Sequence, residues 1–163
     1  MTSVRKDEAS GKLWTSSWLQ SKFQCDYAHQ AIRLAADGTP ELAVGAASVS
    51  ELSGTNISGL ALDPRNGDVW ISSASANSRL VKVDANGNFL AKVDSIWGAQ
   101  AVAVDPTDGS IWTAGISGYG EEGLRKFTSD GAFVLDVPTW PAVQVDGAYA
   151  ITLAQEDCGC SVP

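Results

Sequence analysis

The chain is poor in cysteine, in histidine and in positive charge, and each shortage argues against a kind of site or a kind of partner. Its 163 residues include three cysteines and one histidine, too few for a disulfide framework or a histidine-rich metal site. Lys and Arg number 11 against 19 Asp and Glu, for a formal net charge of −8. This balance argues against nucleic acid and anionic membranes as partners, since both attract clustered positive charge.

Long apolar runs are missing as well. No stretch approaches the length of a membrane span, and residues 1–12, MTSVRKDEASGK, lack the apolar core of a signal peptide or anchor. We therefore expect no membrane segment and no targeting leader, and the compartment stays open. The cysteines Cys25, Cys158 and Cys160 have no partners at metal-ligand spacing.

What the chain does contain is a repeat. The stretch ALDPRNGDVW at 61–70 returns as AVDPTDGSIW at 103–112, 42 positions later. Each copy holds four short apolar runs separated by turn signals, in which Pro fixes φ and Asn-Gly supplies the positive φ of a tight hairpin. Four strands joined by hairpins predict one small antiparallel sheet per copy.

The strand pattern favours one architecture. VWIS and IWTA are apolar at successive positions, so both faces of each sheet require burial. A blade between two neighbouring blades meets that demand, whereas a sandwich sheet with one wet face does not. The period of about 40 residues also matches four-stranded propeller repeats. We predict an all-β, partial β-propeller of about three four-stranded antiparallel blades, almost without helix.

The repeat also predicts the blade boundaries. GKLWTSS and AIRLAADGTPEL match strands two to four of a blade, and nothing upstream resembles GLALD, so the first blade should lack its inner strand. Near the other end, AVQVDGAYAIT resembles a surplus first strand. The predicted segments of this single domain are an incomplete first blade at 11–55, a second blade at 56–98, a third at 99–141, strands of a further or clasped blade at 142–153, and a tail at 154–163.

Three blades fall short of the four to eight of a propeller ring. Either a homo-oligomer completes the ring, with residues 142–152 of one chain completing the first blade of the next, or the missing blades belong to a longer parent chain. The sequence leaves both possibilities open. Cys25 lies in a predicted loop away from the tail, so we expect no disulfide between them.

The second copy, residues 59–90, resembles the NHL repeat. The resemblance is carried by Asp63, the Asn66-Gly67 turn, Trp70-Ile71, the stretch Asn77–Asp84 and the x-Gly-x-Phe ending at Phe89. The third copy matches less well and carries an inserted GISGYGEEG. Related propellers include gluconolactonase-like and regucalcin-like hydrolases, streptogramin lyases and the peptidylglycine amidating lyase. The resemblance implies a propeller and little about activity, because one fold hosts many functions.

In that fold, strand one lines the central channel, and the loops between strands two and three and between strands four and one share one face. The three predicted strand-two-to-three loops, Trp18–Gln30, Ser73–Ser78 and Gly115–Gly123, differ in length, which indicates a shaped surface. We therefore predict a module that binds a small molecule or a protein on this face. The candidate binding residues are Tyr27, His29, Asn56, Asn77, Trp97, Gln100, Tyr119, Glu121, Glu122 and Trp140.

The alternative is a lactonase-like hydrolase or lyase with its site at the channel mouth. The resemblance to lactonases implies a metal held by channel acids and an Asn, but the polar residues at the predicted strand-one entrances, Asn56, Ser58 and Gln100, include no acid. His29 is more simply an ordinary loop histidine than a general base, and Glu121-Glu122 a solvated pair than a calcium ligand. We predict no catalytic residue and no cofactor, with a divalent metal only in the enzyme alternative.

Two repeated residue types have structural roles. Asp63, Asp105 and Asp146 precede turns in successive copies, where a carboxylate accepts backbone N–H bonds. Trp14, Trp70 and Trp112 share one strand position and are predicted to form the core between blades. Trp97 and Trp140 differ because they fall in strand-four-to-one loops, where an indole can stack on a ligand or anchor a partner.

Overall fold

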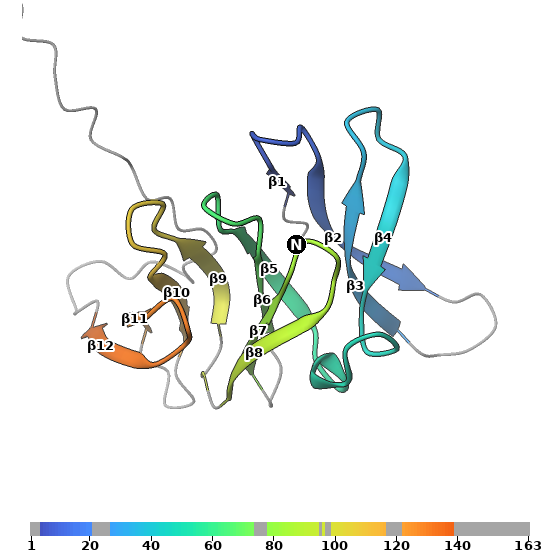
Figure 1. The fold of residues 1–163 in the computed structure, drawn as a ribbon. Coiled ribbons are helices and arrows are strands. Elements are labelled where there is room, and N and C mark those ends of the chain that lie inside the picture. The colour runs from blue at the N-terminus through green and yellow to red at the C-terminus, as the bar shows by residue number, and fades with distance from the viewer. Residues whose placement is uncertain are drawn as a thin grey trace, which may run out of the picture.

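Three four-stranded antiparallel sheets make up the computed structural model, which describes residues 4–20, 27–73, 78–94, 96, 99–116 and 122–138 (Figure 1). The strands are β1 (Val4–Lys6), β2 (Leu13–Gln20), β3 (Tyr27–Leu34) and β4 (Pro40–Val44) in the first sheet; β5 (Ile57–Leu62), β6 (Val69–Ser73), β7 (Arg79–Val83) and β8 (Phe89–Asp94) in the second; and β9 (Ala99–Val104), β10 (Ile111–Ile116), β11 (Glu122–Phe127) and β12 (Phe133–Pro138) in the third. Among the described residues the helical content is one short 3-10 turn, η1 (Ser50–Leu52).

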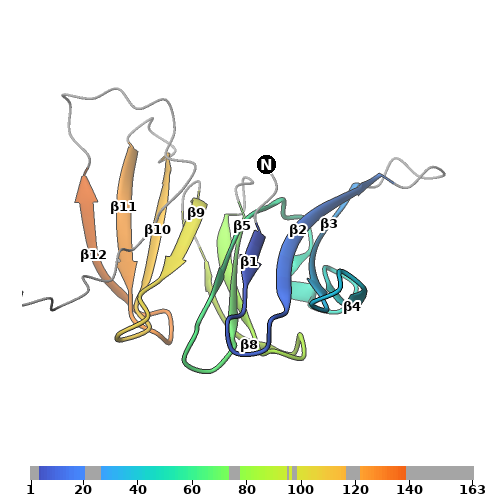
Figure 2. The ribbon, with the colours of Figure 1, turned by 90° about the horizontal axis from the view of Figure 1, so that it is seen from above.

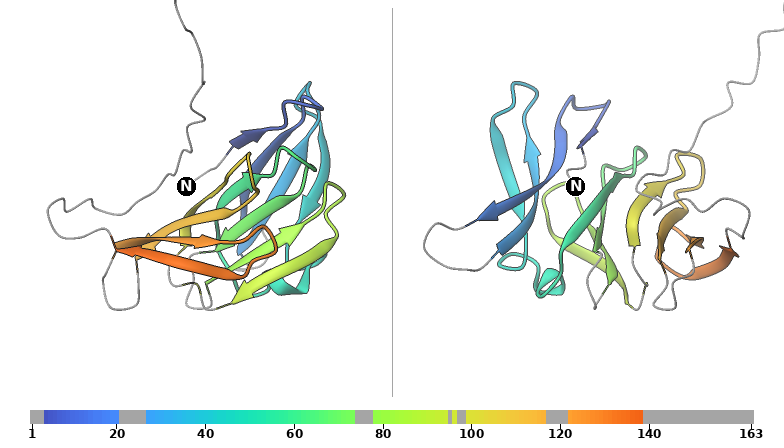
Figure 3. Two further views of the ribbon diagram at one scale, coloured as in Figure 1. Left: turned by 60° about the vertical axis from the view of Figure 1, so that its left-hand side comes forward. Right: turned by 180° about the vertical axis from the view of Figure 1, so that it is seen from behind.

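The sheets stand side by side in chain order, and within each sheet the strands follow in sequence order (Figures 2 and 3). The first strand of the second sheet, β5, contacts β1 and β2 of the first sheet, and it also contacts β9 of the third sheet, which lies against β6 as well. The fourth strands, β4, β8 and β12, form the far edges. This arrangement confirms the predicted partial propeller of three blades, and we call the sheets the first, second and third blades.

The first blade corrects one prediction. The sequence pattern placed its start at residue 11 and left it without an inner strand, but β1 pairs antiparallel with β2 through Val4↔Thr15, Arg5↔Trp14 and Lys6↔Leu13. The strand escaped detection because it is only three residues long and carries two charged side chains, unlike the apolar β5 and β9. The predicted further strands at 142–153 lie outside the described residues.

The hairpin turns repeat more faithfully than the strands. In all three blades the first turn begins with an Asp whose carbonyl accepts a bond from a positive-φ glycine four residues later: Asp7 and Gly11, Asp63 and Gly67, Asp105 and Gly109. The turn between the third and fourth strands likewise uses a positive-φ glycine in each blade, with Gly38, Gly87 and Gly131. Glycine tolerates this left-handed conformation at little steric cost.

The core lies between the blades rather than inside any one of them. One apolar cluster joins the first and second blades and contains Trp14, Val44, Leu60 and Ile71. A second cluster joins the second and third blades and contains Trp70 and Ile111. Consecutive residues of β6 thus enter opposite clusters, which explains why VWIS shows no polar alternation.

The tryptophan prediction is confirmed for the first two blades. Trp14 and Trp70 are 2% and 0% exposed, each covered by the blade that follows it. Trp112, at the same position in the third blade, is half-buried. Within the described segments there is no helix with the length and apolarity needed to cross a bilayer.

Candidate binding face

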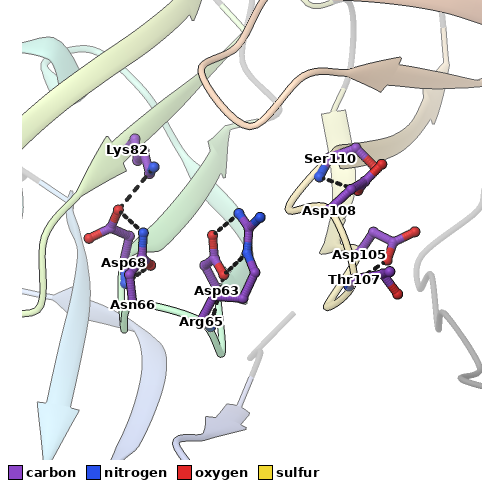
Figure 4. A network of polar contacts seen from close by, with 9 residues as sticks. All are labelled: Asp63, Arg65, Asn66, Asp68, Lys82, Asp105, Thr107, Asp108 and Ser110. Atoms are coloured by element: carbon purple, nitrogen blue, oxygen red, sulfur yellow. Dashed lines mark hydrogen bonds and ion pairs between the residues drawn. The ribbon is translucent and has the colours of Figure 1, made fainter.

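The two ends of the blades differ in how their polar groups are used. At one end lie the short turns. Asp63 of the second blade accepts bonds from the backbone N–H of Arg65 at 3.0 Å and from its guanidinium at 2.9 and 2.7 Å (Figure 4). Burial alone would raise the pKa of Asp63, but these bonds and the nearby positive charge outweigh it and hold the pKa below its usual value. The Asp63 side chain is 1% exposed.

The same turn geometry recurs in the other blades. The carboxylate of Asp105 accepts the backbone N–H of Thr107 at 2.8 Å, and that of Asp7 accepts the backbone N–H of Ala9 at 3.0 Å. The predicted turn-capping role of Asp63 and Asp105 is confirmed. Asp7 plays the same part but was missed, because the strand before it was not recognised, and Asp146 lies outside the described residues.

Charged side chains also close this end of the molecule. Lys82 pairs with Asp68 at 2.9 Å while its ammonium sits 5.7 Å from the ring centre of Trp70. Lys126 sits 5.4 Å from the ring centre of Trp112 in the third blade. The Arg65 guanidinium reaches the neighbouring turn, where a Cβ on Gly109 would overlap it. The polar side chains described at the short-turn end therefore contact other groups of the same chain.

At the other end the inner strands begin. The Ser58 hydroxyl of β5 donates to the carbonyl of Ala99 at 2.6 Å and so joins the inner strands of the second and third blades. Its oxygen lies 3.1 Å from the Ser72 hydroxyl. Since Ser58 has used its single proton, Ser72 is the donor in this pair. Gly59 makes the approach possible, because a Cβ there would lie 2.8 Å from Ser72 Oγ.

Gln100 lies at the same end of the molecule as these serines. It occupies the position in β9 that Ser58 occupies in β5, two residues before the paired apolar core. Its side-chain oxygen Oε1 is buried and has no hydrogen-bond partner among the described residues. An unpaired buried acceptor costs about 1–3 kcal/mol, so a donor that reached this oxygen would recover free energy. Asn56, at the matching entrance to β5, is exposed.

The linker from the first to the second blade is also at this end. Arg79, the arginine of the resemblance motif, donates from Nη1 to the carbonyl of Glu51 in η1 at 2.8 Å. Its backbone N–H donates to Ser73 Oγ at 3.0 Å. Arg79 thereby ties the third strand of the second blade to the linker, which gives it a positioning role in the scaffold.

Two of the predicted strand-two-to-three loops are shorter than expected. The β2–β3 pairing continues through Trp18↔His29 to Gln20↔Tyr27, so Tyr27 and His29 lie in a strand rather than in the loop Trp18–Gln30. This hairpin extends beyond the rest of its blade (Figure 2). In the third blade Glu122 likewise pairs with Ile116 and begins β11. In both hairpins the backbone pairing continues past the apolar runs that marked the strands in the sequence, so the strands are longer and the loops shorter than predicted.

His29 lies on the third strand of its blade, two strands away from the inner strand β1. Partial burial lowers the pKa of His29 below its usual value, which favours the neutral imidazole. This position gives it no place in the Ser58–Gln100 region. Of the other predicted residues, Asn77, Trp97, Tyr119, Glu121 and Trp140 lie outside the described residues, and Tyr27 and Glu122 are described by their backbones only.

Of the predicted residues, therefore, the structure places Asn56 and Gln100 at inner-strand entrances on the same end. Ser58 and Ser72 belong with them. Ser72 was missed because the repeat makes it look like an ordinary strand residue, and only the close approach of Gly59 reveals its contact. In the part of the chain that is described, no three His, Cys, Asp or Glu side chains gather closely enough to hold a metal ion.

Comparisons with known proteins bear on the fold. No family model matches the chain, and no curated protein matches it. Among solved structures it is similar to a protein of unknown function from Bacteroides caccae, with 16% identity and a TM-score of 0.56, and to a eukaryotic initiation factor, with 11% identity and a TM-score of 0.58. It is also similar to a gluconolactonase from Xanthomonas campestris, with 20% identity and a TM-score of 0.57.

In each comparison 83% of this chain is covered. The chain spans 44%, 31% and 46% of the three proteins, respectively, and so less than half of each. Identities this low relate the folds and not the activities. With three four-stranded antiparallel blades and a gluconolactonase among its structural neighbours, the chain has the fold of a partial β-propeller.

Proposed function

We propose that this chain is a binding module whose working surface is the end of the blades where β5 and β9 begin. The observation that carries the proposal is the buried Oε1 of Gln100 at an inner-strand entrance, which has no hydrogen-bond partner within the part of the chain that the structure describes. A ligand donor that reached this oxygen would satisfy it and recover the free energy that an unpaired buried acceptor costs.

The chemistry of this end points to a neutral ligand. Asn56, Ser58 and Gln100 offer amide and hydroxyl groups. Arg79, a charged side chain described at this end, donates to the carbonyl of Glu51 and lies 3.8 Å from the Asp94 carboxylate, so it serves the scaffold. The net charge of −8 disfavours an anionic partner. A small molecule or a neutral protein segment that presents hydroxyl or amide donors fits these groups.

Backbone NMR titration tests the proposal. The probes are neutral hydroxylated compounds, D-glucose and D-glucono-1,5-lactone among them, followed on ¹⁵N-labelled protein. We expect the largest shifts in residues 57–60 and 99–102, and their loss in Gln100→Leu, which removes both amide groups. Thr107→Ala, in the short-turn end, is the matched control and should titrate like the wild type.

Shifts confined to the short turns, or identical titrations of Gln100→Leu and the wild type, would contradict the proposal. Failure of both probes is followed by a panel of neutral peptides and amides, and no response in residues 57–60 and 99–102 to any of them would also contradict it.

The alternative function is that of a propeller enzyme of the lactonase or lyase type. What favours it is the fold similarity to a gluconolactonase. It is tested by following acid release from D-glucono-1,5-lactone with and without added Ca²⁺ or Zn²⁺. Metal-dependent hydrolysis above the spontaneous rate would place the enzyme first, and its absence at all metal concentrations would leave the binding module.

A further inference from the structure

The third blade exposes apolar side chains whose equivalents in the first and second blades are covered by the next blade. Val44 of β4 is 0% exposed in the first apolar cluster, and Val93 of β8 packs against the second. Both stand at the same place after the turn of their blade, and both pair with the same position of the third strand. The equivalent in β12 is Val137, which is 39% exposed, and Leu135 beside it is 37% exposed. We call Trp112, Leu135 and Val137 the trailing face.

The first blade has a complementary face that is only partly covered. In the second blade the side chains that face backward, toward the first blade, are all 0% exposed: Val69, Ile71, Val81 and Val83. Their equivalents by strand pairing in the first blade are only half-buried: Leu13, Thr15, Ile32 and Leu34. We call these four residues the leading face.

One glycine contact shows how a blade covers the next. A Cβ added to Gly87 in the second blade would lie 2.8 Å from Cγ2 of Val44, and one added to Gly131 in the third blade would lie 2.7 Å from Cγ2 of Val93. Each turn glycine therefore receives the valine of the preceding blade. Gly38, the equivalent in the first blade, has nothing within 4 Å. Among the described residues, Gly38 therefore has no valine against it, and Val137, the equivalent valine of the third blade, has no turn glycine of a following blade to contact.

We propose that a second copy of this chain covers both faces, with the trailing face of each copy seated on the leading face of the other. The contact would repeat the two interfaces already present between the blades of this chain, with Val137 against Gly38 of the other copy. Such head-to-tail contacts must either close or continue as a filament. Two copies give six blades, a number within the range of closed propellers.

Two observations support closure by two copies. The trailing and leading faces are the equivalents of surfaces that already meet twice within the chain, so a second copy can repeat the same contact at both open faces. The first blade is complete in its inner strand β1, so the ring closes by stacking of whole blades and does not require a strand from another copy. Open apolar faces of this kind otherwise favour unspecific association.

Sedimentation velocity across a series from nanomolar to micromolar protein tests the proposal on the 163-residue chain. The wild type should sediment with twice the mass of one chain. Leu135→Asp places a carboxylate in the trailing face and should raise the dissociation constant of the dimer about a hundredfold, tenfold for each of the two contacts.

Val134→Asp is the matched control, one residue away on the same strand. Val134 is 45% exposed, and its equivalent Leu90 is 48% exposed although the second blade has neighbours on both sides, so a neighbouring blade leaves this position open. This variant should remain dimeric. Circular dichroism at matched concentration checks that both variants keep their β-structure.

A leading-face variant, Thr15→Glu, distinguishes head-to-tail contact from contact of β12 with itself. It should dissociate like Leu135→Asp, and a mixture of the two variants should associate more strongly than either alone, because one contact of the mixed dimer joins two intact faces. A wild type with the mass of a single chain throughout the series would overturn the proposal. Equal dissociation of the Leu135 and Val134 variants, or a longer natural polypeptide that carries the remaining blades, would also overturn it.

Discussion

Replacing Gly87 by alanine probes the contact on which the blade packing depends. The residue has φ +83°, and its added Cβ would lie 2.8 Å from Val44 Cγ2 and 3.1 Å from Leu42 Cδ2. Gly38 offers a matched control inside the same chain, with φ +86° and open space around it. Both substitutions place an alanine in the same left-handed backbone conformation, but only Gly87→Ala requires the Val44 side chain to move.

The two costs can be worked out separately. An L-residue in the left-handed region costs about 1–2 kcal/mol. Overpacking a close-packed contact adds about 1–3 kcal/mol, and it applies at Gly87 alone. Gly38→Ala should therefore lower the free energy of unfolding by about 1–2 kcal/mol, and Gly87→Ala by about 2–5 kcal/mol.

Urea unfolding followed by tryptophan fluorescence measures both losses. The comparison is made in the Leu135→Asp background, which is expected under the proposed contact between copies to favour single copies and to leave Gly38 uncovered. A loss at Gly87 at least 1 kcal/mol larger than at Gly38 supports the packing described here. Equal losses would refute it, because the preceding blade would then not press on the turn.

Three further predictions concern the core, the turns and the inner strands. Trp70→Ala should cost about 3–5 kcal/mol, and Trp112→Ala in single copies less than half as much, both read from urea unfolding, since the following blade covers only the former; equal costs would contradict the burial pattern. Asp63→Asn should lower the free energy of unfolding by about 2 kcal/mol at pH 7. The pKa of Asp63 is depressed in the folded state. Its stabilising contribution in the wild type is therefore fully present above the ordinary pKa of 3.8 and is lost as the pH falls through the lower pKa of the folded state. An acid-unfolding curve for Asp63→Asn with an undiminished acid-side slope would contradict this. Ser58→Ala should cost about 1 kcal/mol through the loss of its bond to β9, and unchanged thermal stability would show that this bond contributes nothing.

Much of the fold was predictable because the repeat encodes it twice. The Asp63 and Asp105 turns, the tryptophan position and the four-strand unit follow from aligned residues whose turn chemistry has few alternatives. The inner strand β1 was not predictable in this way. An edge strand of three residues, Val4–Lys6, is held by backbone pairing to β2, and backbone pairing leaves no apolar pattern to read.

The candidate site was predictable only in part. Asn56 and Gln100 lie at strand entrances as expected, since strand order fixes which end they occupy. His29 was misplaced because the β2–β3 pairing continues through Trp18, Leu19 and Gln20, a stretch of mixed apolar and polar residues without the alternation that marks a strand. The Ser58–Ser72 contact depends on two strands approaching over Gly59, and a single sequence carries no signal for such a distance.

The central proposal is that the open faces of this three-blade propeller segment are covered by another copy of the chain. The most direct test is an isotope-filtered NOE experiment on a mixture of methyl-labelled and unlabelled chains. The account predicts NOEs between the Val137 methyls of one copy and the Gly38 α-protons of the other, which repeat the Gly87–Val44 contact found within each chain. Spectra that show the Gly87–Val44 contact and no NOE between copies would contradict it.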